Sequence, residues 1–282
     1  MSIRIVTDSG ADLESAEFSQ YQVELVSLGL TIDGRIYSAN QQFNKADFFR
    51  MLEMAKVFPK TSQPAPSAFE ALFEDARQKG DQVVYISIAS ALSGTYQTAT
   101  VVKGLGAYDN VFIVDSRTAT LCQKLLVLHG AKLRDQGCTA QQIVAALEQL
   151  RGRVRVYAGL DTLEYLRKGG RLGRAAASLG TLARIKPVVT VGKDGSVQVA
   201  GKCMGIGRAM KEIQSLLEKN PADPDYPIYG IYSGNQDHVL ELLDRLGMQD
   251  TVQGRIYGLG PVIGAHIGPG AYGIVYVEKE QQ

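Results

Sequence analysis

Short hydrophobic runs alternate with helical patterns through the first half of the chain. The runs that predict strands are Ile3 to Thr7, Val23 to Ile32, Val83 to Ile88, Val111 to Val114 and Val154 to Leu160. Strands that alternate with helices in this way are typical of a parallel sheet covered by helices. We therefore expect an α/β fold whose N-terminal region is a mainly parallel sheet flanked by helices.

Local signals mark where several of the intervening helices begin and end. Ser67-x-x-Glu70 and Thr139-x-x-Gln142 have the form of capping boxes, in which two side chains satisfy free backbone N–H groups at a helix start. Gly80 and Gly137 stand where a glycine commonly ends a helix.

The second half predicts a mixed α+β domain. Asp194-Gly195 suits a tight hairpin turn between Pro187 to Gly192 and Val197 to Ala200, because both central positions accept positive φ. The remaining elements are expected to be helices at Ile206 to Lys219 and Gln236 to Leu246, and strands at Ile228 to Tyr232 and near Ile256 and Ile274. We place the domain boundary near Gly159, which gives domains at residues 1–159 and 160–282.

Length and charge narrow the function classes. A chain of 282 residues fits two domains, and its net charge of +1 gives no reason to expect nucleic-acid binding. The cysteines, Cys122, Cys138 and Cys203, form no CxxC pair, so neither a disulfide framework nor a zinc site is indicated. The first strand leaves no room for a signal segment, and no apolar run reaches the roughly 20 residues of a membrane span. A cytoplasmic protein with at most transient membrane contact is expected.

Serine and threonine cluster where one predicted strand runs into a helix. Ser93-Gly94-Thr95 follows the strand ending at Ile88, and free N–H groups at a helix start favour an anion. Ser93 and Thr95 would add hydroxyl donors, although Ser93 could equally be a simple cap. Asp8-Ser9 and Asp115-Ser116 end neighbouring strands at the same edge, where they could orient hydroxyls or cap helices.

Two further segments could present polar groups to a ligand. Thr61-Ser62-Gln63-Pro64-Ala65-Pro66 is a loop stiffened by prolines, which would hold Thr61 and Ser62 in extended geometry, although it could also be a plain connection. His266 lies in the glycine-rich segment Gly258 to Gly270, where its ring could donate to a carboxylate or merely bridge backbone carbonyls.

The chain resembles the DegV family, whose members are the fatty-acid-binding subunits of bacterial fatty acid kinase. The resemblance runs almost end to end. It is carried by Val6-Thr7-Asp8-Ser9, Thr61-Ser62-Gln63-Pro64, Leu92-Ser93-Gly94-Thr95-Tyr96, Val114-Asp115-Ser116, Leu163-Glu164-Tyr165-Leu166, Lys168-Gly169-Gly170-Arg171, Ile185-Lys186-Pro187 and His266-x-Gly268-Pro269-Gly270. Each motif is weak by itself, but their joint presence in this order is specific.

The resemblance implies that one long-chain fatty acid lies in a buried tunnel and that the chain itself catalyses nothing. It implies a carboxylate site formed by Thr61, Ser62, Ser93, Gly94, Thr95 and His266. A separate ATP-dependent kinase would phosphorylate the bound carboxylate to an acyl phosphate, which a phosphate acyltransferase could pass on toward phospholipid synthesis. No cofactor or metal is implied, and the chain lacks the GxxxxGK[ST] phosphate loop.

Other residues are weaker candidates for the same function. Leu179, Leu182, Ile185 and Ile263 are candidates for the acyl-chain tunnel, although each could be ordinary core. A basic run could dock the kinase, hold a phosphate or form a solvated face, and it consists of Arg167, Lys168, Arg171 and Arg174. Arg208 is a further candidate for kinase docking. The segment Lys202 to Arg208 departs from the family, which commonly has an arginine and a basic helix start there.

Two alternatives stay open at this stage. Ser93, then Asp115 or Asp161, then His266 follow the chain order of an α/β-hydrolase triad, but Ala91 and Thr95 replace the glycines of the Gly-x-Ser-x-Gly elbow. The altered 202–208 segment instead suggests a lipid-sensing regulatory module that no longer delivers its ligand to a kinase.

Overall fold

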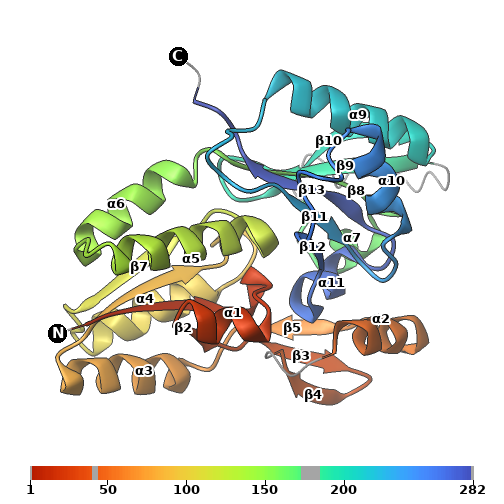
Figure 1. Cartoon of the computed structure of the whole chain (residues 1–282). Helices are drawn as coiled ribbons and strands as arrows, with labels where there is room; N and C mark the ends of the chain where they lie inside the picture. The colour runs from red at the N-terminus through yellow and green to blue at the C-terminus, as the bar shows by residue number, and fades with distance from the viewer. Residues whose placement is uncertain (1, 40–43, 173–184, 281–282) are drawn as a thin grey trace.

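Three sheets and the helices packed on them form the molecule (Figure 1). The computed structural model describes residues 2–39, 44–172 and 185–280. A parallel sheet lies in the first half, a larger mixed sheet in the second half, and a small antiparallel sheet projects from the N-terminal half beside the second. The predicted α/β fold, with a mainly parallel N-terminal sheet and a mixed C-terminal region, is confirmed.

The first sheet is four-stranded and wholly parallel, with the order β2-β1-β6-β7. Its strands are β1 (Ile3–Asp8), β2 (Val23–Val26), β6 (Gln82–Ser87) and β7 (Val111–Asp115). One face is covered by α3 (Pro66–Lys79) and α4 (Thr95–Leu105), and the other by α5 (Thr120–Asp135) and α6 (Ala140–Leu150). Because both faces are buried, these strands are nearly continuous hydrophobic runs rather than alternating ones.

Helix boundaries in this half follow local chemistry, with one exception. The Thr139 hydroxyl accepts from the Gln142 backbone and the Gln142 side chain accepts from the Thr139 backbone, so this predicted capping box is confirmed. Gly80 ends α3 in the left-handed region, at φ 69°. The capping box predicted at Ser67 is wrong, because α3 begins one residue earlier with Pro66 in its first turn.

The small sheet corrects one predicted strand. The run predicted as a single strand from Val23 to Ile32 divides, so that its first part is β2 and its second part, β3 (Gly29–Ile32), leaves for another sheet. There β3 lies between β4 (Arg35–Ser38) and β5 (Lys60–Ser62), antiparallel to both. Between β1 and β2 the chain forms a 3-10 turn, η1 (Ser9–Ala11), and the helix α1 (Ser15–Gln20). The helix α2 (Lys45–Met54) lies between β4 and β5 in the sequence.

The second sheet has six strands in the order β10-β9-β8-β13-β11-β12. They are β8 (Val154–Gly159), β9 (Ile185–Val191), β10 (Val197–Met204), β11 (Tyr229–Tyr232), β12 (Ile256–Gly258) and β13 (Tyr272–Val277). Only β11 and β12 are parallel, and the other neighbours are antiparallel. The hairpin predicted at Asp194-Gly195 is confirmed, because β9 and β10 pair across it.

The strand β8 belongs to this second sheet, although the alternating pattern groups it with the first. It pairs with β13 over its whole length and with β9 at its end. Sheet pairing depends on strands that are distant in sequence, so a local pattern cannot assign it. The domain boundary near residue 159 stays a prediction, and sheet membership favours a division before Val154.

The helices of the second half cover one face of its sheet. They are α9 (Ile206–Lys219) and α10 (Asp237–Arg245), close to the predicted ranges, and they bury Ile213 and Leu242 against Ile274 and Tyr276. Two short helices, α7 (Glu164–Lys168) and α11 (Pro261–Ile267), lie at the end of the sheet nearest the small sheet (Figure 1).

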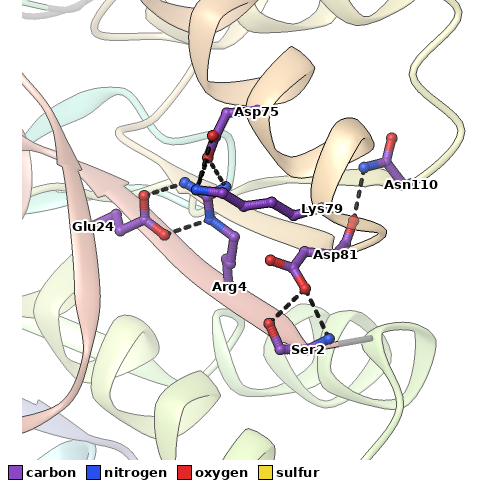
Figure 2. Close-up of polar contacts among 7 residues, drawn as sticks. All are labelled: Ser2, Arg4, Glu24, Asp75, Lys79, Asp81 and Asn110. Carbon is purple, nitrogen blue, oxygen red and sulfur yellow. Dashed lines mark hydrogen bonds and ion pairs between the residues drawn. The ribbon is translucent and has the colours of Figure 1, made fainter.

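Ion pairs secure the edge of the first sheet where β1 begins. Figure 2 shows Arg4, on β1, between Glu24 of β2 and Asp75 of α3. Its guanidinium donates to Glu24 at 2.6 Å and to Asp75 at 2.7 Å, so one side chain joins two strands and a helix. Ser2 donates to Asp81 from both its backbone and its hydroxyl (Figure 2).

One hydrophobic core joins the two larger sheets. It includes Ile5 and Ile86 of the first sheet, Leu121 of α5, and Val156 and Val275 of the second sheet. All five side chains are buried. The face of the second sheet that α9 and α10 leave free is therefore packed on the N-terminal half, and the cavity described below lies at this junction.

Candidate functional site

A mainly apolar cavity of about 100 Å³ lies where the second sheet, α11 and the turn after β6 meet. Its walls come from both halves of the chain. The apolar lining is Leu28, Ile88, Leu92, Ala119, Val156, Ala158, Leu160, Leu166, Val189, Val191, Val197, Ile231, Leu259, Val262, Ile263 and Ile267. The polar lining is much smaller and consists of Thr61, Ser93, Thr120, Arg171, Thr190 and His266. An apolar pocket with few polar groups is the usual form of a small-molecule site.

Thr61 reaches the cavity because of strand alternation in β5. Thr61 pairs with Leu30 of β3, and the two neighbouring side chains of a strand point to opposite faces. Ser62 is therefore exposed, its hydroxyl lies over Gly29, and it does not line the cavity. Ser62 was expected to belong to the carboxylate site, but its side chain lies outside the cavity.

Ser93 is the polar residue of the turn before α4 that lines the cavity, beside Leu92. Its hydroxyl lies 2.8 Å from that of Thr95 and accepts from the Thr95 backbone N–H at 3.4 Å, although the N-cap position of the helix is Gly94. Thr95 is fully buried, and neither it nor Gly94 lines the cavity. The side chain of Gln63 lies directly over Gly94, so a Cβ there would require the Gln63 amide to move. Gly94 and Thr95 thus support Ser93 rather than face the cavity.

His266 contacts Thr61 across the cavity wall. The helix α11 carries His266, whose Nε2 lies 2.7 Å from the Thr61 hydroxyl. Burial, followed by the positive charge of Arg171, lowers the pKa of His266 to about 4. The imidazole is therefore neutral at neutral pH. Its Nδ1 is buried and has no hydrogen-bond partner among the residues that the structure describes.

Two glycines make room for α11 beside α7. A Cβ on Gly169 would lie 2.3 Å from His266 Nδ1, and a Cβ on Gly268 would lie 2.3 Å from the ring of Tyr165. Gly268 also has φ 74°, which glycine adopts readily. Gly169 of the Lys168-Gly169-Gly170-Arg171 motif and Gly268 of the His266-x-Gly268 motif are thus explained by contacts of the histidine ring and of its helix. Gly170 differs, because it has φ 70° and a Cβ there would meet no atom within 4 Å.

Arg171 belongs to the cavity, and not to an exposed docking face as the basic cluster suggested. Its Nε donates to the Leu92 carbonyl at 2.9 Å and its Nη1 donates to the Gly169 carbonyl at 2.6 Å. These bonds tie the turn before Ser93 to the end of α7. They also place a permanent positive charge in the cavity wall beside the hydroxyls.

The other docking candidates divide into exposed and undescribed positions. Arg167 and Arg208 are exposed, and Lys168 is exposed and paired with Glu164 at 2.7 Å. Arg174 lies outside the described residues, as do the tunnel candidates Leu179 and Leu182.

Sequence reasoning found few of the apolar walls. Ile263 lines the cavity as expected, whereas Ile185 begins β9 and is not part of the lining. The wall that was missed on the hairpin comprises Val189, Val191 and Val197. Alternation along β9 was the available signal, because Val189 and Val191 are two residues apart and share a face.

The groups required by a serine hydrolase are present but not assembled. Asp115 accepts from the Ser90 backbone and hydroxyl and from Arg117, and Asp161 pairs with Lys186. A triad needs a carboxylate on the second ring nitrogen of the histidine. No described carboxylate hydrogen-bonds to His266 Nδ1, so this geometry does not support the hydrolase alternative.

The ranges that the structure describes contain no cluster of three or more histidine, cysteine or acidic side chains that could hold a metal ion. None of their helices is both long and apolar enough to cross a bilayer. Cys122, Cys138 and Cys203 are free thiols.

The fold and site define an α/β protein of three sheets with a mainly apolar cavity that has a few polar groups in its wall. A family model described as "Uncharacterised protein, DegV family" matches residues 2–279. The chain belongs to the DegV family. A DegV domain-containing protein of Caldanaerobacter subterraneus is 30% identical, and the match covers 98% of this chain and 99% of that protein. One of Listeria monocytogenes is 31% identical with the same coverage.

Solved structures of similar proteins share the whole fold. A fatty acid-binding DegV family protein from Thermus thermophilus is 32% identical, with a TM-score of 0.86 over 99% of this chain and 100% of that chain. The fatty acid-binding DegV family protein SAG1342 from Streptococcus agalactiae is 26% identical, with a TM-score of 0.88 over the same shares. A stearic acid-binding protein from Eubacterium ventriosum is 25% identical, with a TM-score of 0.81 over 99% of each chain.

Proposed function

We propose that this chain binds one long-chain fatty acid, with the carboxylate at Thr61, Ser93 and Arg171 and the acyl chain along the apolar walls. The observation that carries the proposal is the cavity itself, which is apolar over most of its surface and has hydroxyls, an imidazole and a guanidinium at one end. Similar proteins that bind fatty acids, such as that of Thermus thermophilus, support the ligand class.

The hydrogen bonds of His266 suggest how the head group is held. A buried N–H without an acceptor is costly, so the unpaired Nδ1 favours the neutral tautomer with its proton on Nε2. Nε2 then donates to Thr61 Oγ1, which leaves the Thr61 hydroxyl hydrogen free for the ligand. Thr61 and Ser93 would donate to the carboxylate, and Arg171 would balance its charge.

The acyl chain would supply most of the affinity. Burial of about fifteen methylenes at ~0.8 kcal/mol each contributes on the order of 12 kcal/mol before ordering costs. The polar end instead prevents a buried carboxylate from being left unpaired, which would cost several kcal/mol. Loss of a head-group partner should therefore weaken binding without abolishing affinity for the tail.

Binding a long chain must widen the cavity. Its volume of about 100 Å³ is below the roughly 300 Å³ of the smaller ligand pockets. The walls that have to separate are the β9–β10 hairpin and α11, because they carry Val189, Val197 and Ile263. We expect the bound form to differ from this structure mainly there.

Mass spectrometry of the purified protein tests the proposal directly. Native spectra should show a mass added to the protein, and denaturation should release a fatty acid that is identified by its accurate mass. Ser93→Ala and Arg171→Met should retain less ligand, whereas Arg208→Met, an exposed basic residue outside the cavity, should retain the wild-type amount. Purified protein that neither carries nor takes up any fatty acid would refute the proposal.

The finer part of the proposal concerns delivery. The bound carboxylate would be presented to a separate ATP-dependent kinase, and the acyl phosphate would pass to a phosphate acyltransferase. The test is reconstitution of the loaded protein with a candidate kinase and ATP, with acyl phosphate trapped by hydroxylamine. Binding without phosphorylation by any tested kinase would favour a lipid-sensing module over a carrier.

A further inference from the structure

The segment Tyr257–Gly260 determines the position of α11 and hence of the head-group site. It runs from the last two residues of β12 to the N-cap of α11, and α11 carries His266 together with the wall residues Val262 and Ile263. A shift of this segment would move the imidazole relative to Thr61, which lies on a different sheet. Whatever fixes the segment therefore fixes the geometry of the head-group site.

A buried carboxylate from the N-terminal half holds the start of α11. Asp12 follows η1, is 5% exposed, and accepts from the Gly260 backbone N–H at 3.0 Å through Oδ1. Its Oδ2 accepts from the Thr120 hydroxyl at 2.7 Å. Gly260 is the N-cap of α11, so this bond satisfies a backbone donor at the very residue where the helix begins.

Both partners of this contact hold an uncommon backbone conformation. Asp12 and Thr120 each have φ 53°, in the left-handed region. For a β-branched residue such as Thr120 this is a genuine outlier. Unfavourable backbone conformations persist where the surroundings enforce them, and they concentrate at functional sites. Thr120 itself lines the cavity, so the strained pair lies directly beside the ligand space.

Two lysines hold the rest of the same segment from the N-terminal half. Lys45 Nζ donates to the Gly258 carbonyl at 2.8 Å and pairs with Glu14 at 2.6 Å. Lys124 is fully buried, pairs with Glu17 at 2.5 Å, and its Nζ lies 3.5 Å from the centre of the Tyr257 ring. Tyr257, Gly258 and Gly260 thus each contact a charged side chain of the N-terminal half.

We propose that Asp12 is a positioning residue for the fatty acid head group, which acts through Gly260 and α11 on His266, with Lys45 and Lys124 in support. Asp12 does not touch the ligand in this scheme. The inference rests on the proposed function, because it concerns how the same site is held. It extends that function by assigning a role to a carboxylate that does not line the cavity.

Two substitutions of Asp12 separate its hydrogen-bond acceptor from its charge. Burial raises the pKa of Asp12 to about 6, so its ionised form is less favourable in the folded chain than in the unfolded one. The charged groups that act on it are Lys45 and Glu14. Asparagine removes the charge and keeps an oxygen that can accept from the Gly260 N–H, whereas alanine removes the acceptor as well.

The experiment compares Asp12→Ala with Asp12→Asn and with Glu278→Gln. Glu278 is also a buried carboxylate, but its partner is Arg155 of β8. Binding of a fluorescent fatty acid, the melting temperature and the ¹⁵N signals of the His266 ring are measured for each. Asp12→Ala should bind about tenfold more weakly and shift the His266 signals, and Asp12→Asn, which keeps the acceptor, should restore both toward the wild type. Glu278→Gln should melt lower, bind normally and leave the His266 signals unmoved.

Unmoved His266 signals in Asp12→Ala would overturn the inference, and so would shifts in Asp12→Asn as large as those in Asp12→Ala. Should Asp12→Ala fail to fold, Lys45→Met serves instead, because Lys45 is partly exposed and contacts the same segment. It should shift the same signals, and unmoved signals would overturn the inference. The His266 signals are recorded on ligand-free protein, so the positioning role is decided even if the wild type takes up no fatty acid and the proposed function fails.

Discussion

A single methyl group at position 169 should disable the head-group site while leaving the fold intact. Gly169 ends α7 with φ −74°, a conformation that alanine adopts without strain. An alanine Cβ there would lie 2.3 Å from His266 Nδ1 and 3.0 Å from His266 Cε1. The Gly169→Ala variant therefore tests the position of the imidazole by steric means alone.

The size of the effect follows from these distances. Normal contact of about 3.5 Å requires a ring displacement of about 1.2 Å from the present 2.3 Å. A displacement of this size can break the 2.7 Å contact between His266 and Thr61. Without this contact the Thr61 hydroxyl is no longer oriented toward the carboxylate. A hydrogen bond to a charged group such as the carboxylate contributes about 1.5–3 kcal/mol, so its loss corresponds to a loss of affinity between about 10-fold and 100-fold.

Titration with a fluorescent fatty acid measures this loss of affinity. Alanine substitutions at two other glycines, one adjacent to Gly169 and one in α4, provide controls. Gly170→Ala introduces backbone strain at φ 70° but meets no atom within 4 Å. Gly104→Ala, in α4, also meets no atom within 4 Å, has ordinary backbone, and should slightly stabilise the helix. Both controls should bind normally. Wild-type affinity in Gly169→Ala, with unchanged His266 ring signals, would refute the role assigned to the imidazole.

Further predictions concern pH, a buried ion pair and chain-length selection. The pKa of His266 is about 4 in the folded protein and 6.5 in its ordinary state, so the unfolded chain binds the proton first as the pH falls, and the free energy of unfolding should decrease from about pH 6.5 to pH 4. Urea titrations should show that the free energy of unfolding depends less on pH in His266→Gln, and an equal pH dependence in both proteins would contradict this. Lys124→Met should lower the free energy of unfolding by ~3 kcal/mol, because Glu17 loses its ion-pair partner. The double variant Lys124→Met/Glu17→Gln should recover part of this loss in the same urea titrations. Val189→Phe should narrow the cavity, so that mass spectrometry finds shorter fatty acids bound than in the wild type; an unchanged distribution would count against Val189 as a wall.

Elements that depend on local patterns were predicted well. The hairpin at Asp194-Gly195, the helix Ile206–Lys219 and the capping box at Thr139 each need only neighbouring residues to form, so the sequence carries their full signal. The assignment of strands to sheets was not local. Nothing near Val23 to Ile32 marks the point where the chain leaves one sheet for another, and β8 pairs with β13, more than a hundred residues later.

The site divides in the same way. Thr61, Ser93 and His266 were found because motifs from three parts of the chain named them together, and the structure brings all three to one cavity. Which face of a strand carries a given side chain was harder to predict, because a shift of one residue along β5 exchanges the positions of Thr61 and Ser62. Arg171 was assigned to an exposed face because a basic run usually is solvated, whereas its bonds to the Leu92 and Gly169 carbonyls require the folded chain.

The place of β13 in the second sheet has a consequence for biosynthesis. The first sheet has all its strands once Asp115 has been made, so the N-terminal half can begin to fold early during translation. The second sheet has its last strand, Tyr272–Val277, between β8 and β11. A nascent chain therefore holds two separated groups of strands with unpaired edges until Tyr272–Val277 has left the ribosome, and the ligand cavity can close only then.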